Sequence, residues 1–192
     1  MLEARLFGEG SNAVVLTHMY PANQSSWFSY ARRLQSEGYM VLTFNFRGFG
    51  KSQGKKDIAL APRDLKGALR FMASKGAAKI AVVGASMGGT AALVTASDHP
   101  VAAVASLSAP DEFEGLDAVS AVQKVTSPML FVAATGDGQA ANDAERLYRS
   151  SGDPAAGLEL VPGEAHGTQL LDGDSGKKVR PLVEKFLKES FA

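Results

Sequence analysis

The sequence has no cysteine, no net charge and no long hydrophobic run. The absence of cysteine excludes disulfides, a thiol nucleophile and thiolate metal ligands, and it fits a reducing compartment. Lys and Arg together number 20, as do Asp and Glu, which argues against nucleic acid or an anionic membrane as a partner because both attract a basic surface. The densest basic stretch, Lys51–Lys56, is expected to be a solvated loop. No window approaches about 18 uninterrupted apolar residues and the first residues lack a signal-peptide pattern, so we predict a cytoplasmic protein with no membrane partner.

The apolar residues are gathered in short runs along the whole chain. A chain of 192 residues has the length of one domain, and we predict a single domain over residues 1–192. Most of the runs are continuous rather than alternating, which indicates strands buried on both faces, as in a parallel sheet. The six predicted strands are residues 13–17, 40–46, 79–84, 101–107, 129–134 and 158–161.

Segments with a helical spacing of apolar residues separate most of these runs. Gly38 and Gly76 follow two of the segments, where a glycine commonly ends a helix. Pro181 is expected in the first turn of the last helix, where its missing N–H costs little. The five predicted helices are residues 26–37, 57–75, 87–96, 142–150 and 179–191.

This alternation predicts an α/β fold with a mostly parallel central sheet and helices on both of its faces. Ligands of such sheets bind beyond the carboxyl ends of the strands, so functional residues should directly follow strands. The segment 108–127 is the only long gap in the pattern. It is too short for a separate lid, and we expect no cap domain.

A nucleophile motif follows the third predicted strand. Gly84-Ala85-Ser86-Met87-Gly88 lies between the strand 79–84 and the helix 87–96, and it matches G-x-S-x-G. The two glycines remove Cβ atoms that would collide in a tight strand–turn–helix, and the hydroxyl then projects at the start of a helix. The dinucleotide motif G-x-G-x-x-G and the P-loop motif are absent. We therefore predict that Ser86 is a nucleophile.

A serine hydroxyl needs a neighbouring base, and the sequence offers three histidines for this role. His166 lies in a loop directly after the strand 158–161, at the expected edge of the sheet. His99 precedes Pro100 at the end of a helix, which places it at the opposite edge. His18 closes a strand at the correct edge, but its loop has another use, given below. We predict that His166 is the general base.

The base needs a carboxylate that fixes its tautomer and stabilises the imidazolium. Asp137 directly follows the strand 129–134, and the chain order Ser86, Asp137, His166 is the order found in hydrolases with a G-x-S-x-G elbow. The other acidic candidates are Asp143, Asp172 and Asp174. Asp143 is expected to begin a helix, and the remaining two are expected in solvated turns. We predict that Asp137 orients the histidine.

Taken in order, these motifs resemble the α/β-hydrolase family over nearly the whole chain, in the manner of a small, lid-less serine esterase of the dienelactone-hydrolase type. His18-Met-Tyr-Pro21 is similar to the H-G-x-P oxyanion loop of that family, with Met19 in place of the glycine. Phe44–Ser52 is similar to its D-x-R-G-x-G-x-S stretch, with Asn45 in place of the aspartate. The resemblance implies that Arg47, Gly48 and Ser52 brace the loop under the site.

Two N–H donors are needed to hold the oxyanion of a tetrahedral intermediate. Met87, directly after the nucleophile, is the expected first donor. The resemblance implies that Tyr20 supplies the second N–H and that His18 anchors the loop. The candidates for an apolar substrate pocket are Met19, Tyr20, Trp27, Met87 and Phe113. For Trp27 the favoured expectation is that it packs its helix onto the sheet.

The predicted reaction is a two-step acyl transfer on a small carboxylic ester, with Ser86 carrying the acyl group, as in a carboxylesterase. It requires no metal and no organic cofactor. The same triad serves thioesters, lactones and small amides, so these substrates stay open. A non-catalytic, ligand-binding member of the fold is the alternative of another class. The expected partner is a small-molecule ester, and the protein is expected to be a monomer or a homodimer.

Overall fold

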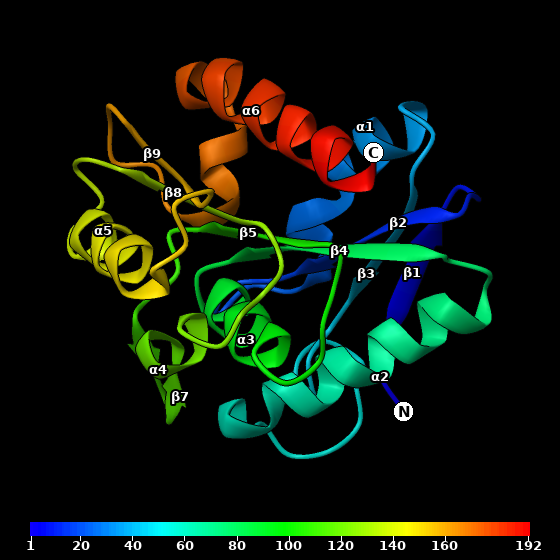
Figure 1. Cartoon of the computed structure of the whole chain (residues 1–192). Coiled ribbons are helices and arrows are strands. Elements are labelled where there is room, and N and C mark those ends of the chain that lie inside the picture. The colour runs from blue at the N-terminus through cyan, green and yellow to red at the C-terminus, as the bar shows by residue number, and fades with distance from the viewer.

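The computed structural model describes all 192 residues, and a seven-stranded sheet forms its centre (Figure 1). The strand order is β1-β3-β2-β4-β5-β8-β9, and only β1, at one edge, runs antiparallel to its neighbour. The strands are β1 (Ala4–Phe7), β2 (Asn12–Thr17), β3 (Met40–Phe44), β4 (Lys79–Ala85), β5 (Ala103–Leu107), β8 (Met129–Ala134) and β9 (Gly157–Val161). The predicted mostly parallel sheet is confirmed.

Helices cover both faces of this sheet, as predicted. In Figure 1, α1 and α6 lie on one face, and α2, α3, α4 and α5 lie on the other. The helices are α1 (Phe28–Ser36), α2 (Ala61–Ser74), α3 (Met87–Ala96), α4 (Ala118–Val122), α5 (Ala140–Ser151) and α6 (Gly173–Phe191). Short 3₁₀ helices η1 (Gln24–Trp27), η2 (Ile58–Leu60) and η3 (Gly167–Leu171) precede α1, α2 and α6. None of the helices combines the length and the apolar character needed to cross a membrane.

The segment between β5 and β8 contains small elements that the sequence pattern did not predict. A two-stranded hairpin, β6 (Glu112–Phe113) with β7 (Leu116–Asp117), leads directly into α4. The helix α4 packs against α3 and α5 and extends the helical layer on that face of the sheet. No separate cap domain is formed by these residues, in agreement with the expectation.

The last helix begins earlier than the sequence pattern indicated, at Gly173 rather than near residue 179. Pro181 therefore lies inside α6, and its expected place in the first turn is wrong. The reason is that the first turns of α6 are polar, so they carry no apolar periodicity. Asp174 in the first turn still favours a helix start, because a carboxylate there interacts well with the helix dipole.

Candidate active site

The turn from β4 to α3 holds Ser86 in a backbone conformation with φ +48° and ψ −122°. Such a conformation costs a non-glycine residue about 1–3 kcal/mol, and the surrounding contacts enforce it. A Cβ on Gly84 would lie 2.5 Å from the Gly88 oxygen, and one on Gly88 would lie 2.7 Å from the His18 oxygen. The Ser86 N–H also donates a 2.8 Å hydrogen bond to the Leu107 oxygen. The turn therefore has the form of a nucleophile elbow at the carboxyl end of the sheet.

His166 and Asp137 are in direct contact. The Nδ1 atom of His166 lies 2.8 Å from Oδ2 and 3.0 Å from Oδ1 of Asp137. Asp137 follows β8 and His166 follows β9, and a 2.7 Å hydrogen bond from the Gly136 N–H to the Gly163 oxygen joins the two loops. Because the carboxylate accepts the proton of Nδ1, the Nε2 atom is left as the acceptor for a hydroxyl proton.

The histidine loop packs against the nucleophile elbow and the oxyanion loop. A Cβ on Gly167, whose φ is +57°, would lie 3.3 Å from Cβ of Ala85 and 2.7 Å from Sδ of Met19. Gly167 directly follows His166, and Ala85 directly precedes Ser86. Their close approach therefore places the histidine loop beside the elbow. No hydrogen bond joins Ser86 Oγ to His166 in the structure, and such bonds often tighten only when a substrate binds.

His18 is fully buried and ties the oxyanion loop to the end of β3. Its Nε2 atom accepts a 3.1 Å hydrogen bond from the Phe46 N–H, so its Nδ1 atom carries the proton and donates to the Met19 oxygen at 3.0 Å. The rings of Phe46 and Phe49 pack edge-on against it. Burial lowers the pKa of His18 to about 4, and the hydrogen bond to Met19 opposes this only in part. The imidazole is therefore neutral, and it serves as an anchor for the loop rather than as a base.

This anchor also orients the peptide group between Met19 and Tyr20. In a trans peptide the carbonyl and the N–H point in opposite directions, so holding the Met19 oxygen turns the Tyr20 N–H away from His18. The Tyr20 N–H donates no backbone hydrogen bond. Met87 is the first residue of α3, where an N–H has no acceptor within the helix. Two free donors are thus available on the loop and on the elbow.

The stretch after β3 is held by hydrogen bonds to η1, to α2 and within itself. The side-chain Oδ1 of Asn45 accepts a 2.7 Å hydrogen bond from the Gln24 N–H. The hydroxyl of Ser52 donates to the main-chain oxygen of Asn45 at 2.6 Å. The guanidinium and N–H of Arg47 donate to the carboxylate of Asp64, which is buried in α2, at 2.6 Å and 2.9 Å. The ion pair raises the pKa of Arg47.

A hollow of about 420 Å³ lies beside the oxyanion loop. The rings of Tyr20 and Phe113 are 6.3 Å apart across its wall, so the structure brings together two of the predicted pocket residues. Met19 instead packs beneath the histidine loop, against Gly167. The lining residues of the hollow are Tyr20, Lys56, Asp57, Ile58, Ala59, Phe113 and Glu114.

Trp27 does not contribute to the pocket. Its side chain is fully buried against Tyr30 and the core residues beneath α1. The expectation that Trp27 contacts a substrate is therefore wrong, and its packing role is the one observed.

The rival acid, Asp143, lies within α5 and contacts Gln139 rather than His166. Burial and the neighbouring charge of Asp111 raise the pKa of Asp143.

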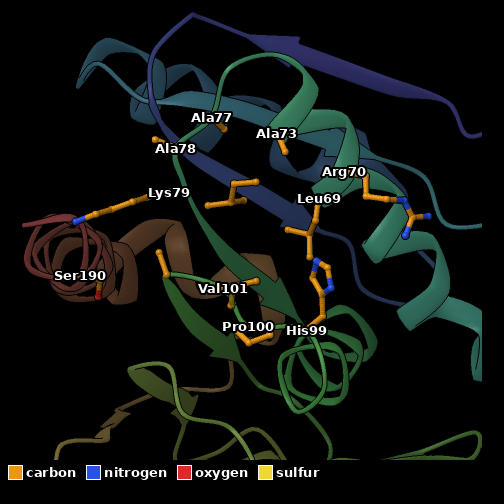
Figure 2. Close-up of a pocket in the computed structure, with 12 residues that line it drawn as sticks. Leu69, Arg70, Ala73, Ala77, Ala78, Lys79, His99, Pro100, Val101 and Ser190 are labelled. Atoms are coloured by element: carbon orange, nitrogen blue, oxygen red, sulfur yellow. The ribbon is translucent and has the colours of Figure 1, made fainter.

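A second hollow of about 530 Å³ lies at the amino ends of β4 and β5, away from the elbow (Figure 2). Figure 2 shows Leu69 and Ala73 of α2 on one side and His99, Pro100 and Val101 on the other. His99 thus lies at the edge of the sheet that the sequence predicted, opposite the site. Ser86, Asp137 and His166 line neither hollow, but the hollow of about 420 Å³ is lined by Tyr20 of the oxyanion loop.

Comparisons with known proteins agree with this geometry. The sequence profile of the alpha/beta hydrolase fold family matches residues 12–154. The chain therefore belongs to the α/β-hydrolase family. A search of curated protein sequences gives no match.

Solved structures of the same fold cover nearly the whole chain. A monoacylglycerol lipase of Paleococcus ferrophilus is 16% identical with a TM-score of 0.85, and 99% of each chain is covered. The esterase PF2001 of Pyrococcus furiosus is 18% identical with a TM-score of 0.81, and the match covers 100% of this chain and 92% of the other. An alpha-beta serine hydrolase homologue of Coxiella burnetii is 25% identical with a TM-score of 0.71, covering 98% and 91%. At these identities the likeness establishes the fold.

Proposed function

We propose that this protein is a serine hydrolase that cleaves small carboxylic esters through an acyl-enzyme on Ser86. The observation that carries the proposal is the contact of 2.8 Å between His166 and Asp137 at the same sheet edge as a strained serine elbow. The esterases and the lipase of the same fold are consistent with it. The protein is further proposed to act as one domain over residues 1–192, in the cytoplasm, on a small-molecule substrate.

In the proposed reaction, Ser86 attacks the ester carbonyl while Nε2 of His166 takes the hydroxyl proton. The negative charge on the carbonyl oxygen is held by the N–H groups of Met87 and Tyr20, donors that are free in the resting protein. Asp137 stabilises the imidazolium, which then protonates the leaving alcohol. Water attacks the acyl-enzyme in the same manner and releases the acid.

The test is the hydrolysis of 4-nitrophenyl acetate and its longer-chain homologues by the wild type and by Ser86→Ala, His166→Ala and Asp137→Asn. Each triad variant is expected to lose about 10³-fold or more in kcat, because the members of a triad act as a unit. Ser97→Ala is the matched control, since Ser97 lies at the far end of the same helix α3. A fluorophosphonate probe should phosphonylate Ser86 alone, with loss of fluoride and of the hydroxyl proton.

Two results would contradict the proposal. Activity that survives in folded Ser86→Ala would remove Ser86 as the nucleophile. A wild type that is inert toward esters and unlabelled by the probe would favour the non-catalytic, ligand-binding alternative. Labelling without ester turnover would direct attention to thioesters, lactones and small amides, which the same triad serves.

A further inference from the structure

Lys56 occupies a defined position beside the oxyanion loop. Its ammonium lies 4.9 Å from the ring centre of Tyr20 and 4.5 Å from that of Phe49, within the range of a cation–π contact. The Phe49 ring rests in turn on His18. The backbone of Lys56 is fixed as well, because a Cβ on Gly48 would lie only 2.6 Å from Cα of Lys56. The lysine is exposed, and its ammonium lies over two aromatic rings at the rim of the hollow.

The charge of Lys56 is not neutralised by an ion pair. Nine ion pairs between Lys or Arg and Asp or Glu are present in the structure, and Lys56 takes part in none of them. Two carboxylates also line the hollow, Asp57 and Glu114. Both carboxylates are exposed, and neither takes part in an ion pair. Lys56 is the one cation among the lining residues, and it lies beside Tyr20.

We propose that Lys56 makes the enzyme selective for esters that carry a carboxylate in the portion lying between Tyr20 and Phe113. This inference rests on the proposed esterase function and specifies its substrate class. The aromatic rings bind the apolar body of the substrate, and the ammonium pairs with its carboxylate at the rim. A lysine suits this task because its ammonium is a compact point charge on a flexible stem.

The test compares matched esters that differ only in charge. On the alcohol side these are 4-acetoxybenzoate, 4-acetoxybenzamide and 4-acetoxy-N,N,N-trimethylanilinium. On the acyl side they are the 4-nitrophenyl monoester of adipic acid and the same ester of its monoamide. The readout is the ratio of kcat/KM for the anionic ester to that for the neutral ester, measured separately for each protein variant.

We expect the ratio in one of the two series to fall about two- to fivefold in Lys56→Met, the magnitude of an exposed ion pair. Lys56→Arg should restore the ratio, because it keeps the cation. Lys55→Met is the matched control, since Lys55 is exposed and makes no contact with these rings, and its ratio should equal that of the wild type. Added salt should lower the ratio of the wild type.

The inference fails if Lys56→Met keeps the ratio of the wild type in both series. It also fails if the wild type prefers the cationic ester, because Asp57 and Glu114 would then dominate the hollow. In either case the hydrolysis of the neutral esters still supports the proposed function. If the wild type hydrolyses none of the esters, the proposed function itself fails, and its substrate class with it.

Discussion

Acid should destabilise this protein through one buried group, His18. In the folded state the Nε2 atom accepts the Phe46 N–H, and the ring lies against two phenylalanines. A proton on Nε2 would remove that acceptor and place a charge in an apolar site. The folded protein therefore resists protonation of His18 down to a pKa of about 4. The unfolded chain takes up the proton at the ordinary value of 6.5.

The sign and size of the effect follow from these two values. Between pH 6.5 and about 4 the unfolded state binds more protons than the folded state, so the free energy of unfolding falls as the pH falls. Above this window His18 is neutral in both states and has no effect. One pH unit corresponds to about 1.4 kcal/mol, so His18 alone removes about 3 kcal/mol across the window. For a domain of ordinary stability this is a large fraction of the total.

Urea unfolding of the wild type and of His18→Gln, from about pH 8 to about pH 4, isolates this contribution. Both proteins share all other titrating groups, so their difference reports His18. The variant should be less stable near pH 8, because it loses the anchor, and the gap should shrink by about 3 kcal/mol as the pH falls to 4. A gap that stays constant over this range would refute the reasoning.

Two further predictions concern the contacts around the site. Gly88→Ala should cost about 1–3 kcal/mol in urea unfolding and should reduce ester turnover, because its Cβ would press on the main-chain oxygens of Thr17 and His18. Gly67→Ala, in an open position on α2, is its matched control, and a similar loss there would argue against a local clash. Asp64→Asn should lower the free energy of unfolding by about 1–3 kcal/mol, because the buried charge partner of Arg47 is lost. An unchanged unfolding midpoint would show that this ion pair adds no net stability.

The sequence predicted the parallel part of the sheet because those strands are buried on both faces and read as continuous apolar runs. It did not predict β1 (Ala4–Phe7), three of whose four residues are exposed at the sheet edge. It also did not predict α4 (Ala118–Val122), which is too short to display a helical period. Short helices and edge strands are stabilised mainly by tertiary packing, so the local sequence pattern indicates them only weakly.

The candidate site divides in the same way. Ser86, Asp137 and His166 were predicted from the G-x-S-x-G motif, the chain order and the carboxyl-edge rule, and the structure places each of them in a loop after a strand. The lysines of the stretch Lys51–Lys56 are exposed in a loop, as the sequence indicates, but only the structure shows that the ammonium of Lys56 lies over Tyr20 and Phe49. Nothing in the local sequence signals a contact of this kind, because the partners come from separate loops. Side-chain contacts between separate loops are the part of a site that sequence patterns describe least.

The three loops of the site are joined by backbone contacts at glycines rather than by side chains alone. Gly88 fits against the carbonyl of His18, and the Thr17 hydroxyl donates to the Gly88 oxygen at 2.9 Å. Gly167 fits against Ala85 and the oxyanion loop in the same manner. A larger residue at Gly88 or Gly167 would therefore press one of these loops against its neighbour, so a change in one loop of the candidate site acts on the others.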